Sequence, residues 1–203
     1  MIGFADFEAF LKASFPDMTD GMVERFRLMD AGYRDWNAKI NVISRKDIDS
    51  LYDHHVLHSL AIAEYLRTQR PEVYSMFTAP LQEGSVAPVS SSTNVNASRA
   101  GLRVLDLGTG GGFPGIPLAV MFPNVRFTLC DSVGKKTIVA REIANMLGLD
   151  NVEIVNARAE SLPGRFDFVV SRAVASLTDF YPWVKGKYSQ SILYLKGGDI
   201  NEE

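Results

Sequence analysis

The chain has 203 residues, of which 46% are hydrophobic and 22% are charged, and its formal net charge is −3. These values are typical of a globular protein with one domain of ordinary size and a smaller additional unit, and they do not indicate a nucleic-acid-binding protein. A local basic face would nevertheless be sufficient to bind nucleic acid.

The N-terminal segment and the cysteine content favour a cytoplasmic protein. Asp6 and Glu8 lie where a secretory signal peptide would carry a basic run, so no such signal is expected. The single cysteine, Cys130, excludes an internal disulfide and fits a reducing compartment. No apolar run is long enough to span a bilayer, so we expect no membrane partner.

Apolar residues in the first part of the chain follow a helical spacing. Phe4, Phe7 and Leu11 share one side of a helix that ends before Pro16, and Thr19 is a typical N-cap for the next helix. The predicted helices cover residues 4–15, 20–36 and 47–67, with an irregular connector at 37–44. Together they predict a helical unit over residues 1–81.

Residues 82–101 are rich in Gly, Ser, Asn and Pro, which predicts a flexible linker or surface loop. From 102 to 203, apolar strand-like runs alternate with helical patterns. The predicted strands are 103–107, 126–130, 152–155, 166–170 and 192–195, and the predicted helices are 113–122, 134–147 and 177–187. This alternation predicts an α/β fold, Rossmann-like, with a parallel sheet that binds its ligand at the carboxyl ends of the strands.

Four glycines occupy five positions from Gly108 to Gly112, directly after the first predicted strand. Glycine allows positive φ and a close approach of the backbone to a ligand, and the following helix start supplies free N–H groups. With Asp106 they form the pattern DxGxGxG. S-adenosylmethionine suits this pattern, because its ammonium group needs an acid nearby and its amino-acid portion needs a backbone surface.

A dinucleotide-dependent oxidoreductase is the alternative. Gly110, Gly112 and Gly115 also satisfy GxGxxG, with Asp131 at a plausible distance for a ribose. That register leaves Asp106 unexplained, and no Tyr-xxx-Lys pair for hydride transfer follows the fourth predicted strand. We therefore favour S-adenosylmethionine over NAD.

Three further residues border the predicted cofactor site. Asp131 ends the second predicted strand, where its carboxylate can accept both ribose hydroxyls or cap the next turn. Ala159 and Glu160 follow the third predicted strand, where a backbone N–H and an acid can meet an adenine ring. Glu160 could equally be a solvated loop acid.

The segment after the fourth predicted strand indicates the chemistry. Ser171-Arg172-Ala173 lacks the Asn/Asp-Pro-Pro-aromatic turn that is common in enzymes methylating exocyclic amines. Cys130 lies in the second predicted strand, wrongly placed to activate a pyrimidine ring. Guanine N7 has a free lone pair and needs neither device, so orientation could supply most of the catalysis. We predict that Arg172 contacts cofactor, base or phosphate, rather than only a salt-bridge partner at the sheet edge.

Three histidines, His54, His55 and His58, lie close together in the third predicted helix. The i, i+3 spacing of His55 and His58 could ligate a metal ion, but no cysteine or third ligand lies nearby. We expect no metal, and a polar helix face or a helix-to-sheet contact instead.

Several segments match one family in order along nearly the whole chain. They are Trp36-Asn37 with Asn41, then 55–60, 104–117, 129–136, 158–160, 171–177 and 195–197. Together they resemble the glucose-inhibited division protein B family, the bacterial 16S rRNA guanine-N7 methyltransferases. The resemblance implies the class I S-adenosylmethionine-dependent methyltransferase fold and methylation of a guanine N7 in small-subunit rRNA. It also implies cofactor contacts at Gly108, Phe113, Ala159, Glu160 and Arg172.

The chain departs from the family at three points. His58 stands where the family has an acid, and residues 82–101 exceed the usual connector. The family continues through two more strands beyond the equivalent of Glu203, so we expect the sheet to lack its last strands and the fifth strand to be an exposed edge. A non-catalytic RNA-binding module that keeps this fold is therefore a third interpretation.

The expected partner is 16S rRNA or the small-subunit particle, bound by a monomer. Its phosphates would meet basic residues around the mouth of the predicted crevice, and such binding weakens steeply with salt. The candidates are Arg45, Lys46, Lys135, Lys136, Arg158 and Lys196.

Overall fold

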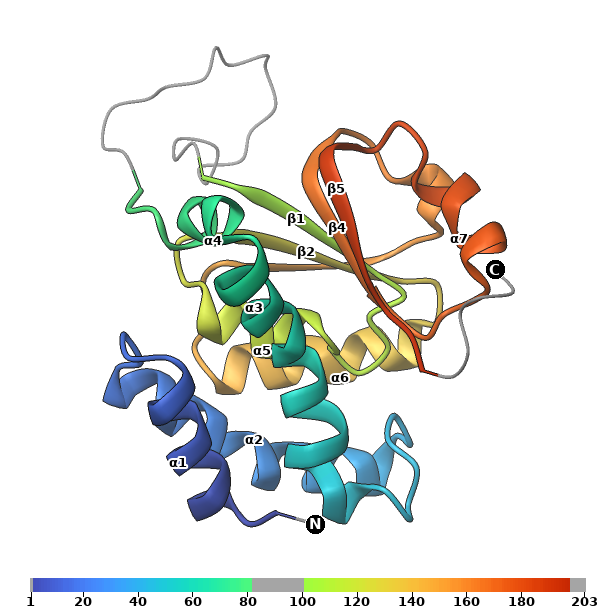
Figure 1. Cartoon of the computed structure of the whole chain (residues 1–203). Coiled ribbons are helices and arrows are strands. Elements are labelled where there is room, and N and C mark those ends of the chain that lie inside the picture. The colour runs from blue at the N-terminus through green and yellow to red at the C-terminus, as the bar shows by residue number, and fades with distance from the viewer. Residues whose placement is uncertain (1, 82–100, 198–203) are drawn as a thin grey trace.

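Five parallel strands lie at the centre of the computed structural model, which describes residues 2–81 and 101–197 (Figure 1). They are β1 (Arg103–Leu107), β2 (Arg126–Asp131), β3 (Val152–Asn156), β4 (Phe166–Arg172) and β5 (Tyr188–Leu195). Their order in the sheet is β3-β2-β1-β4-β5. The order reverses between β1 and β4, which is where open α/β sheets bind their ligands. The predicted α/β fold with a parallel sheet is confirmed.

Successive residues of each strand point to opposite faces, so the sheet has a hydrophobic core on each side. In β1, Val104 lies in the larger core, while Leu105 and Leu107 lie in the smaller one. The register of β4 against β5 shifts between Phe166 and Phe168. The extra residue at this shift lies in β5, between Tyr188 and Ser191. Phe166 belongs to the smaller core and Phe168 to the larger.

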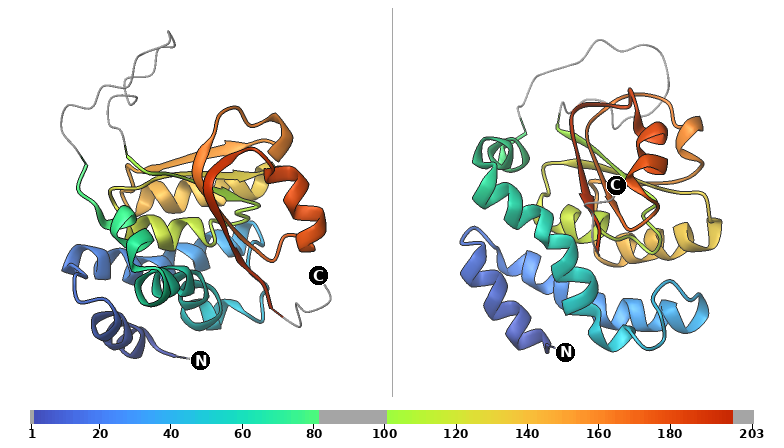
Figure 2. Two further views of the ribbon diagram at one scale, coloured as in Figure 1. Left: turned by 45° about the horizontal axis from the view of Figure 1, so that its top comes forward. Right: turned by 45° about the vertical axis from the view of Figure 1, so that its right-hand side comes forward.

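Helices cover both faces of the sheet (Figures 1 and 2). On the larger core lie α5 (Gly115–Met121) and α6 (Gly134–Met146), and on the smaller core lies α7 (Leu177–Val184). Ser176 caps α7, because its side chain accepts a hydrogen bond from the N–H of Asp179. The helix predicted from residue 113 begins later, since Phe113 and Pro114 still belong to the glycine turn.

In the described part of the chain, four α-helices precede the sheet: α1 (Phe4–Ser14), α2 (Asp20–Lys39), α3 (His58–Gln69) and α4 (Pro71–Thr78). The prediction of a single helix over residues 47–67 is wrong in detail. A 3₁₀ turn (Ile48–Ser50) and a π-helical segment (Leu51–Leu57) precede α3. The separate α4 was not predicted, although Pro71 in its first turn is a typical start signal.

The N-terminal helices pack onto α5 and α6, so they extend the larger core (Figure 2). Phe26 and Phe77 are fully buried in the same cluster as Val104 and Phe168. The rings of Phe77 and Phe168 have their centroids 5.1 Å apart. Such buried aromatic pairs join the helices to the sheet. The linker predicted at 82–101 lies outside the described residues except for Gly101, which has no regular structure.

Within the described residues, no helix combines the length and the apolar character that a transmembrane span requires.

Candidate active site

A cavity of about 510 Å³ opens at the carboxyl ends of β1, β2, β3 and β4, beside the reversal in strand order. A volume in this range is typical of a site for a small molecule. Every residue predicted to bind the cofactor lines this cavity: Gly108, Gly110, Phe113, Asp131, Ala159, Glu160 and Arg172. The structure therefore brings together residues that are up to 64 positions apart in the chain (172 − 108 = 64).

The glycine turn forms one wall of the cavity. Gly108 has φ +74° and Gly110 has φ +57°, a region that residues with a side chain rarely adopt. The N–H groups of Gly108 and Thr109 donate to the carbonyl of Cys130 at 2.8 and 3.1 Å, which ties the turn to β2. A Cβ at Gly110 would meet no atom within 4 Å, so this part of the turn presents bare backbone.

Asp106 lies fully buried behind the glycine turn. Its Oδ2 accepts hydrogen bonds from the hydroxyl of Thr109 at 2.6 Å and from the N–H of Gly115 at 2.8 Å. Its Oδ1 is buried and has no hydrogen-bond partner. Burial raises the pKa of Asp106 to about 7, against the opposing effects of these two hydrogen bonds and of Arg172. A negative charge on Asp106 therefore costs free energy, and a further cation nearby would reduce that cost.

Asp131, at the end of β2, holds two backbone segments in place. Its Oδ2 accepts from the N–H of Gly110 at 2.9 Å, and its Oδ1 accepts from the N–H of Val133 at 2.8 Å. The expected turn-capping role is therefore present. An ionised carboxylate has about four lone-pair sites, so these two bonds leave acceptor capacity for the ribose contact that the sequence predicts.

Arg172 closes β4 at the opposite wall of the cavity. Its Nη1 donates to the backbone carbonyl of His54 at 3.2 Å, and its Nη2 lies 3.1 Å from Nδ1 of His55. Its Cζ lies 5.1 Å from the centre of the Phe113 ring, a cation–π distance. Burial lowers the pKa of Arg172, and Asp106, Tyr33 and Asp47 oppose that effect. A guanidinium keeps its proton in proteins, so the cavity contains a fixed positive charge.

Sequence reasoning missed two contributions of the N-terminal helices to this site. Tyr33 is buried, stacks on the ring of Phe113 with centroids 4.7 Å apart, and donates its hydroxyl to the carbonyl of Gly111 at 3.0 Å. Val42 lines the cavity on a loop that Asn37 holds, because Asn37 Oδ1 accepts from the N–H of Val42 at 2.8 Å. Asn37 was noted only within a family motif, which carried no structural role.

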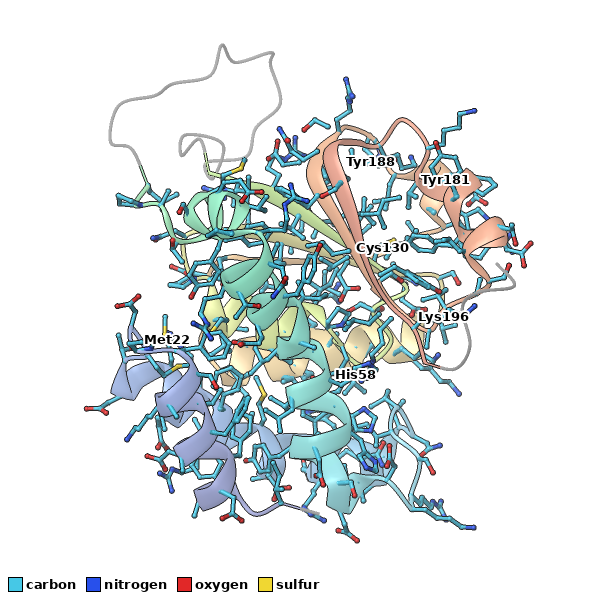
Figure 3. All side chains as sticks on the ribbon, in the orientation of Figure 1. Met22, His58, Cys130, Tyr181, Tyr188 and Lys196 are labelled. Carbon is cyan, nitrogen blue, oxygen red and sulfur yellow. The ribbon has the colours of Figure 1, made fainter. Side chains whose placement is uncertain are left out.

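The basic candidates for RNA binding lie in three places around the site. Lys136 and Arg158 line the cavity itself. Arg45 and Lys135 are exposed near it, on the turn after the Val42 loop and in the first turn of α6. Lys196 directly follows β5, at the carboxyl end of the strand, as Figure 3 shows. Because Leu195 pairs with Arg172, Lys196 lies at the same edge of the sheet as the cavity.

Two of the three histidines, His54 and His55, share one hydrogen-bonding partner. Oδ1 of Asp47 lies 2.5 Å from Nδ1 of His54, and Oδ2 of Asp47 lies 2.6 Å from Nε2 of His55. His58 lies at the start of α3 (Figure 3), where burial and Arg172 lower its pKa. Among the residues that the structure describes, no three His, Cys, Asp or Glu side chains are grouped so that they could hold a metal ion.

The residues of the cavity fit S-adenosylmethionine. Asp106 does not line the cavity but lies directly behind the glycine turn, and its buried Oδ1 has no hydrogen-bond partner. A carboxyl group in this position suits a ligand whose cationic group lies against the turn. The open backbone at Gly110 suits the amino-acid portion of the ligand, and Asp131 suits a ribose.

A parallel sheet of this order, with a glycine turn after its first strand and an acid at the end of its second, is the arrangement of the class I S-adenosylmethionine-dependent methyltransferases, which share it with the dinucleotide-binding Rossmann folds. The model of the GidB family, described as rRNA small subunit methyltransferase G, matches residues 85–203. The chain belongs to this family.

Curated relatives support the assignment over nearly the full chain. Ribosomal RNA small subunit methyltransferase G of Christiangramia forsetii is 44% identical over 201 residues, which cover 95% of this chain and 81% of the relative. The protein of the same name from Flavobacterium psychrophilum is 46% identical over 197 residues, which cover 93% of this chain and 80% of the relative. Among solved structures, the ribosomal protein L11 methylase of Lactobacillus delbrueckii subsp. bulgaricus is similar with a TM-score of 0.42 and 21% identity, over 46% of this chain and 50% of that chain.

The family membership fixes the general activity. The chain is a methyltransferase that uses S-adenosylmethionine and acts on small-subunit ribosomal RNA.

Proposed function

We propose that the protein transfers the methyl group of S-adenosylmethionine to N7 of a guanine in 16S rRNA, in the cytoplasm. The observation that carries this proposal is the chemistry of two side chains that line the cavity, Arg172 and Cys130. Arg172 provides a fixed cation there, and the one cysteine is not a nucleophile. Burial raises the pKa of Cys130 to about 11, and its thiol donates to the carbonyl of Ala157 at 3.2 Å.

This arrangement favours an acceptor that needs neither covalent activation nor removal of a proton before attack. Guanine N7 carries an exposed lone pair and meets that requirement. A C5-pyrimidine acceptor would require a thiolate, which the Cys130 environment opposes. The rate then depends chiefly on orientation of the two reactants, which can supply several kcal/mol of the barrier reduction (roughly 7–11 in favourable systems).

We assign roles to the cavity residues accordingly. Bound S-adenosylmethionine supplies an electrophilic methyl group on a sulfonium centre. The turn at Gly108 and Gly110 would hold its amino-acid portion, and Asp131 its ribose. Ala159 and Glu160 would border its adenine, since both line the cavity in the 3₁₀ turn Ala159–Ser161 after β3. Phe113 would pack beside the cofactor, while Arg172 orients cofactor and base or a neighbouring phosphate.

The proposed RNA contacts are Arg45, Lys135, Lys136 and Lys196. Lys136 lines the cavity, Lys135 precedes it in the first turn of α6, and Lys196 follows β5. Arg45 lies three positions after Val42, which lines the cavity, so an RNA chain crossing the cavity mouth would meet several of these residues. Each phosphate contact contributes a slope of about −0.7 to −0.9 to the dependence of log affinity on log salt. The variant Lys136→Ala should therefore bind a small-subunit rRNA fragment more weakly, with the salt slope reduced by about 1. An unchanged slope would remove Lys136 from the contact surface.

The direct test is methyl transfer from labelled S-adenosylmethionine to small-subunit rRNA that lacks the modification. The site is then read by borohydride and aniline cleavage, which is specific for N7-methylguanine. We expect one cleavage site with the unmodified protein. Arg172→Ala should lower kcat/KM by roughly 100-fold, because misplacement of the reacting groups by about 1 Å has an effect of that size.

Arg165→Ala provides the matched control, since Arg165 is exposed at the amino end of β4 and donates only to the carbonyl of Tyr188. It should leave kcat/KM within about twofold. Methyl incorporation without cleavage would show a different acceptor atom. Cofactor binding without any methyl incorporation would favour the non-catalytic RNA-binding module.

A further inference from the structure

The guanidinium of Arg172 is held by the histidine segment of the N-terminal helices. It contacts the backbone carbonyl of His54 and the ring of His55, which are 118 and 117 positions away in the chain. The His55 side chain is only 12% exposed, and its ring lies 5.3 Å from that of Phe113. Phe113, Arg172 and His55 therefore pack around one another at the wall of the cavity.

The chemistry of the partners fixes the proton positions in this group. A guanidinium offers only donors, so Nδ1 of His55 must accept from Arg172 and carry no proton. The single proton of the neutral ring is then on Nε2, which donates to Oδ2 of Asp47 at 2.6 Å. Asp47 uses its other oxygen to accept from Nδ1 of His54.

The surroundings of His55 favour this neutral form. Burial lowers the pKa of His55, Asp47 opposes that effect, and the positive charge of Arg172 and the neighbouring His54 add to it. Protonation would place a second donor against the guanidinium and break the contact. The neutral ring is thus a rigid acceptor whose orientation Asp47 determines.

We propose that Asp47 and His55 form a positioning pair that sets the orientation of the Arg172 guanidinium at the methyl-transfer site. The proposal rests on the catalytic role of Arg172 given above. A free arginine side chain has about 2 kcal/mol of rotamer entropy, so an unanchored guanidinium would sample many positions in the cavity mouth. Two hydrogen bonds from one segment, together with the ring of Phe113, select one of them.

Local backbone structure supports a specific role for this segment. His54 and His55 lie in the π-helical residues Leu51–Leu57, between a 3₁₀ turn and α3. π-helical turns are rare and are frequent at functional sites. Here the irregular turn directs two consecutive imidazoles to a single carboxylate, while the carbonyl of His54 remains available to Arg172.

Two substitutions of His55 separate its two contacts. In His55→Asn, the amide oxygen takes the place of Nδ1 and can still accept from Arg172. In His55→Gln, the amide nitrogen takes the place of Nε2 and can still donate to Asp47, but the contact with Arg172 is lost. Arg165→Ala again serves as the control, because Arg165 is exposed and lies outside this hydrogen-bonded group.

The measurement is single-turnover methylation of small-subunit rRNA, with thermal unfolding and S-adenosylmethionine binding followed in parallel. We expect His55→Ala and His55→Gln to lower the single-turnover rate constant by about 10-fold, and His55→Asn and Arg165→Ala to stay within about threefold, with the RNA concentration that gives half the maximal rate little changed. In the Arg172→Ala background, His55→Ala should cause no further loss beyond about twofold, because its effect passes through Arg172.

Three results would overturn the proposal: full activity of His55→Ala, equal activity of His55→Asn and His55→Gln, or an undiminished effect of His55→Ala in the Arg172→Ala background. If His55→Ala does not fold, the methylation rates of His55→Asn and His55→Gln still test the proposal. The proposed function fails in a different way, namely if Arg172→Ala retains full activity or if no N7 methyl group forms with the unmodified protein.

Discussion

Asp106 offers a sharp physical test of the site, because it is a fully buried acid with one unpartnered oxygen. The substitution Asp106→Asn keeps an oxygen that can accept from Thr109 and from the N–H of Gly115. It removes the titrating proton. The difference in stability between the two proteins therefore isolates the cost of burying the negative charge.

The sign of the effect follows from the direction of the pKa change. Folding raises the pKa of Asp106 from 3.8 to about 7, so the folded protein holds a proton that the unfolded chain has already lost. Its contribution to stability is fully present below 3.8 and is lost as the pH rises to about 7. At about 1.4 kcal/mol for each pKa unit, the total loss approaches about 4 kcal/mol, of which about 2 kcal/mol falls between about pH 5 and pH 7.

The assay is urea unfolding of both proteins without cofactor across this range of pH. We subtract the unfolding free energy of the unmodified protein from that of Asp106→Asn at each pH. We expect this difference to increase by about 2 kcal/mol between about pH 5 and pH 7. Asp150→Asn, at an exposed position, controls for the loss of one negative charge. Saturating S-adenosylmethionine should reduce this difference in unfolding free energy at neutral pH, because its ammonium group favours the ionised form of Asp106. A difference that does not change with pH would falsify the account of Asp106.

Two further predictions concern the walls of the cavity. Gly110→Ala should cost about 1–3 kcal/mol of stability through its positive φ alone, since its Cβ meets no atom within 4 Å. Its affinity for S-adenosylmethionine, measured by calorimetry, should fall at least about tenfold, and an unchanged affinity would mean that this backbone does not face the ligand. Tyr194→Phe removes a hydroxyl that donates to the carbonyl of Ala175 at 2.7 Å and accepts from the N–H groups of Val174 and Ala175. We expect it to lower the unfolding free energy by about 1–2 kcal/mol and kcat by severalfold, whereas an unaltered kcat would show that the loop after β4 needs no anchor.

Much of the fold could be predicted because its signals are local. The alternation of apolar strands and helical patterns after residue 102 identified all five strands, and the positions of β1 and β2 agree with the prediction within one residue. The start of β5 was missed, since Tyr188, Ser189 and Gln190 give no continuous apolar run. The π-helical segment was also missed, because its residues have ordinary helical periodicity and only the hydrogen-bond pattern distinguishes it.

The glycine turn and its acids could be predicted because DxGxGxG is a contiguous pattern whose chemistry follows from residue types. The partners of Arg172 could not be predicted from the sequence. Its contact with His55 joins positions 117 residues apart, and the sequence around each residue does not indicate the other. The same holds for Tyr33, which reads as one more apolar position of α2 until Gly111 and Phe113 are placed against it. Residues that form a site across elements become visible only once the packing is known.

The N-terminal helices are part of the active site because three of their contacts converge on one short turn. Tyr33 donates to the carbonyl of Gly111 and stacks on Phe113, and His55 packs against the same ring. Val42 covers Gly111, where a Cβ would come within 2.8 Å of its side chain. The cofactor turn is therefore shaped by the helices as much as by the sheet. Any movement of these helices when RNA binds would be transmitted directly to the turn that we propose as the cofactor-binding backbone, and through His55 to Arg172.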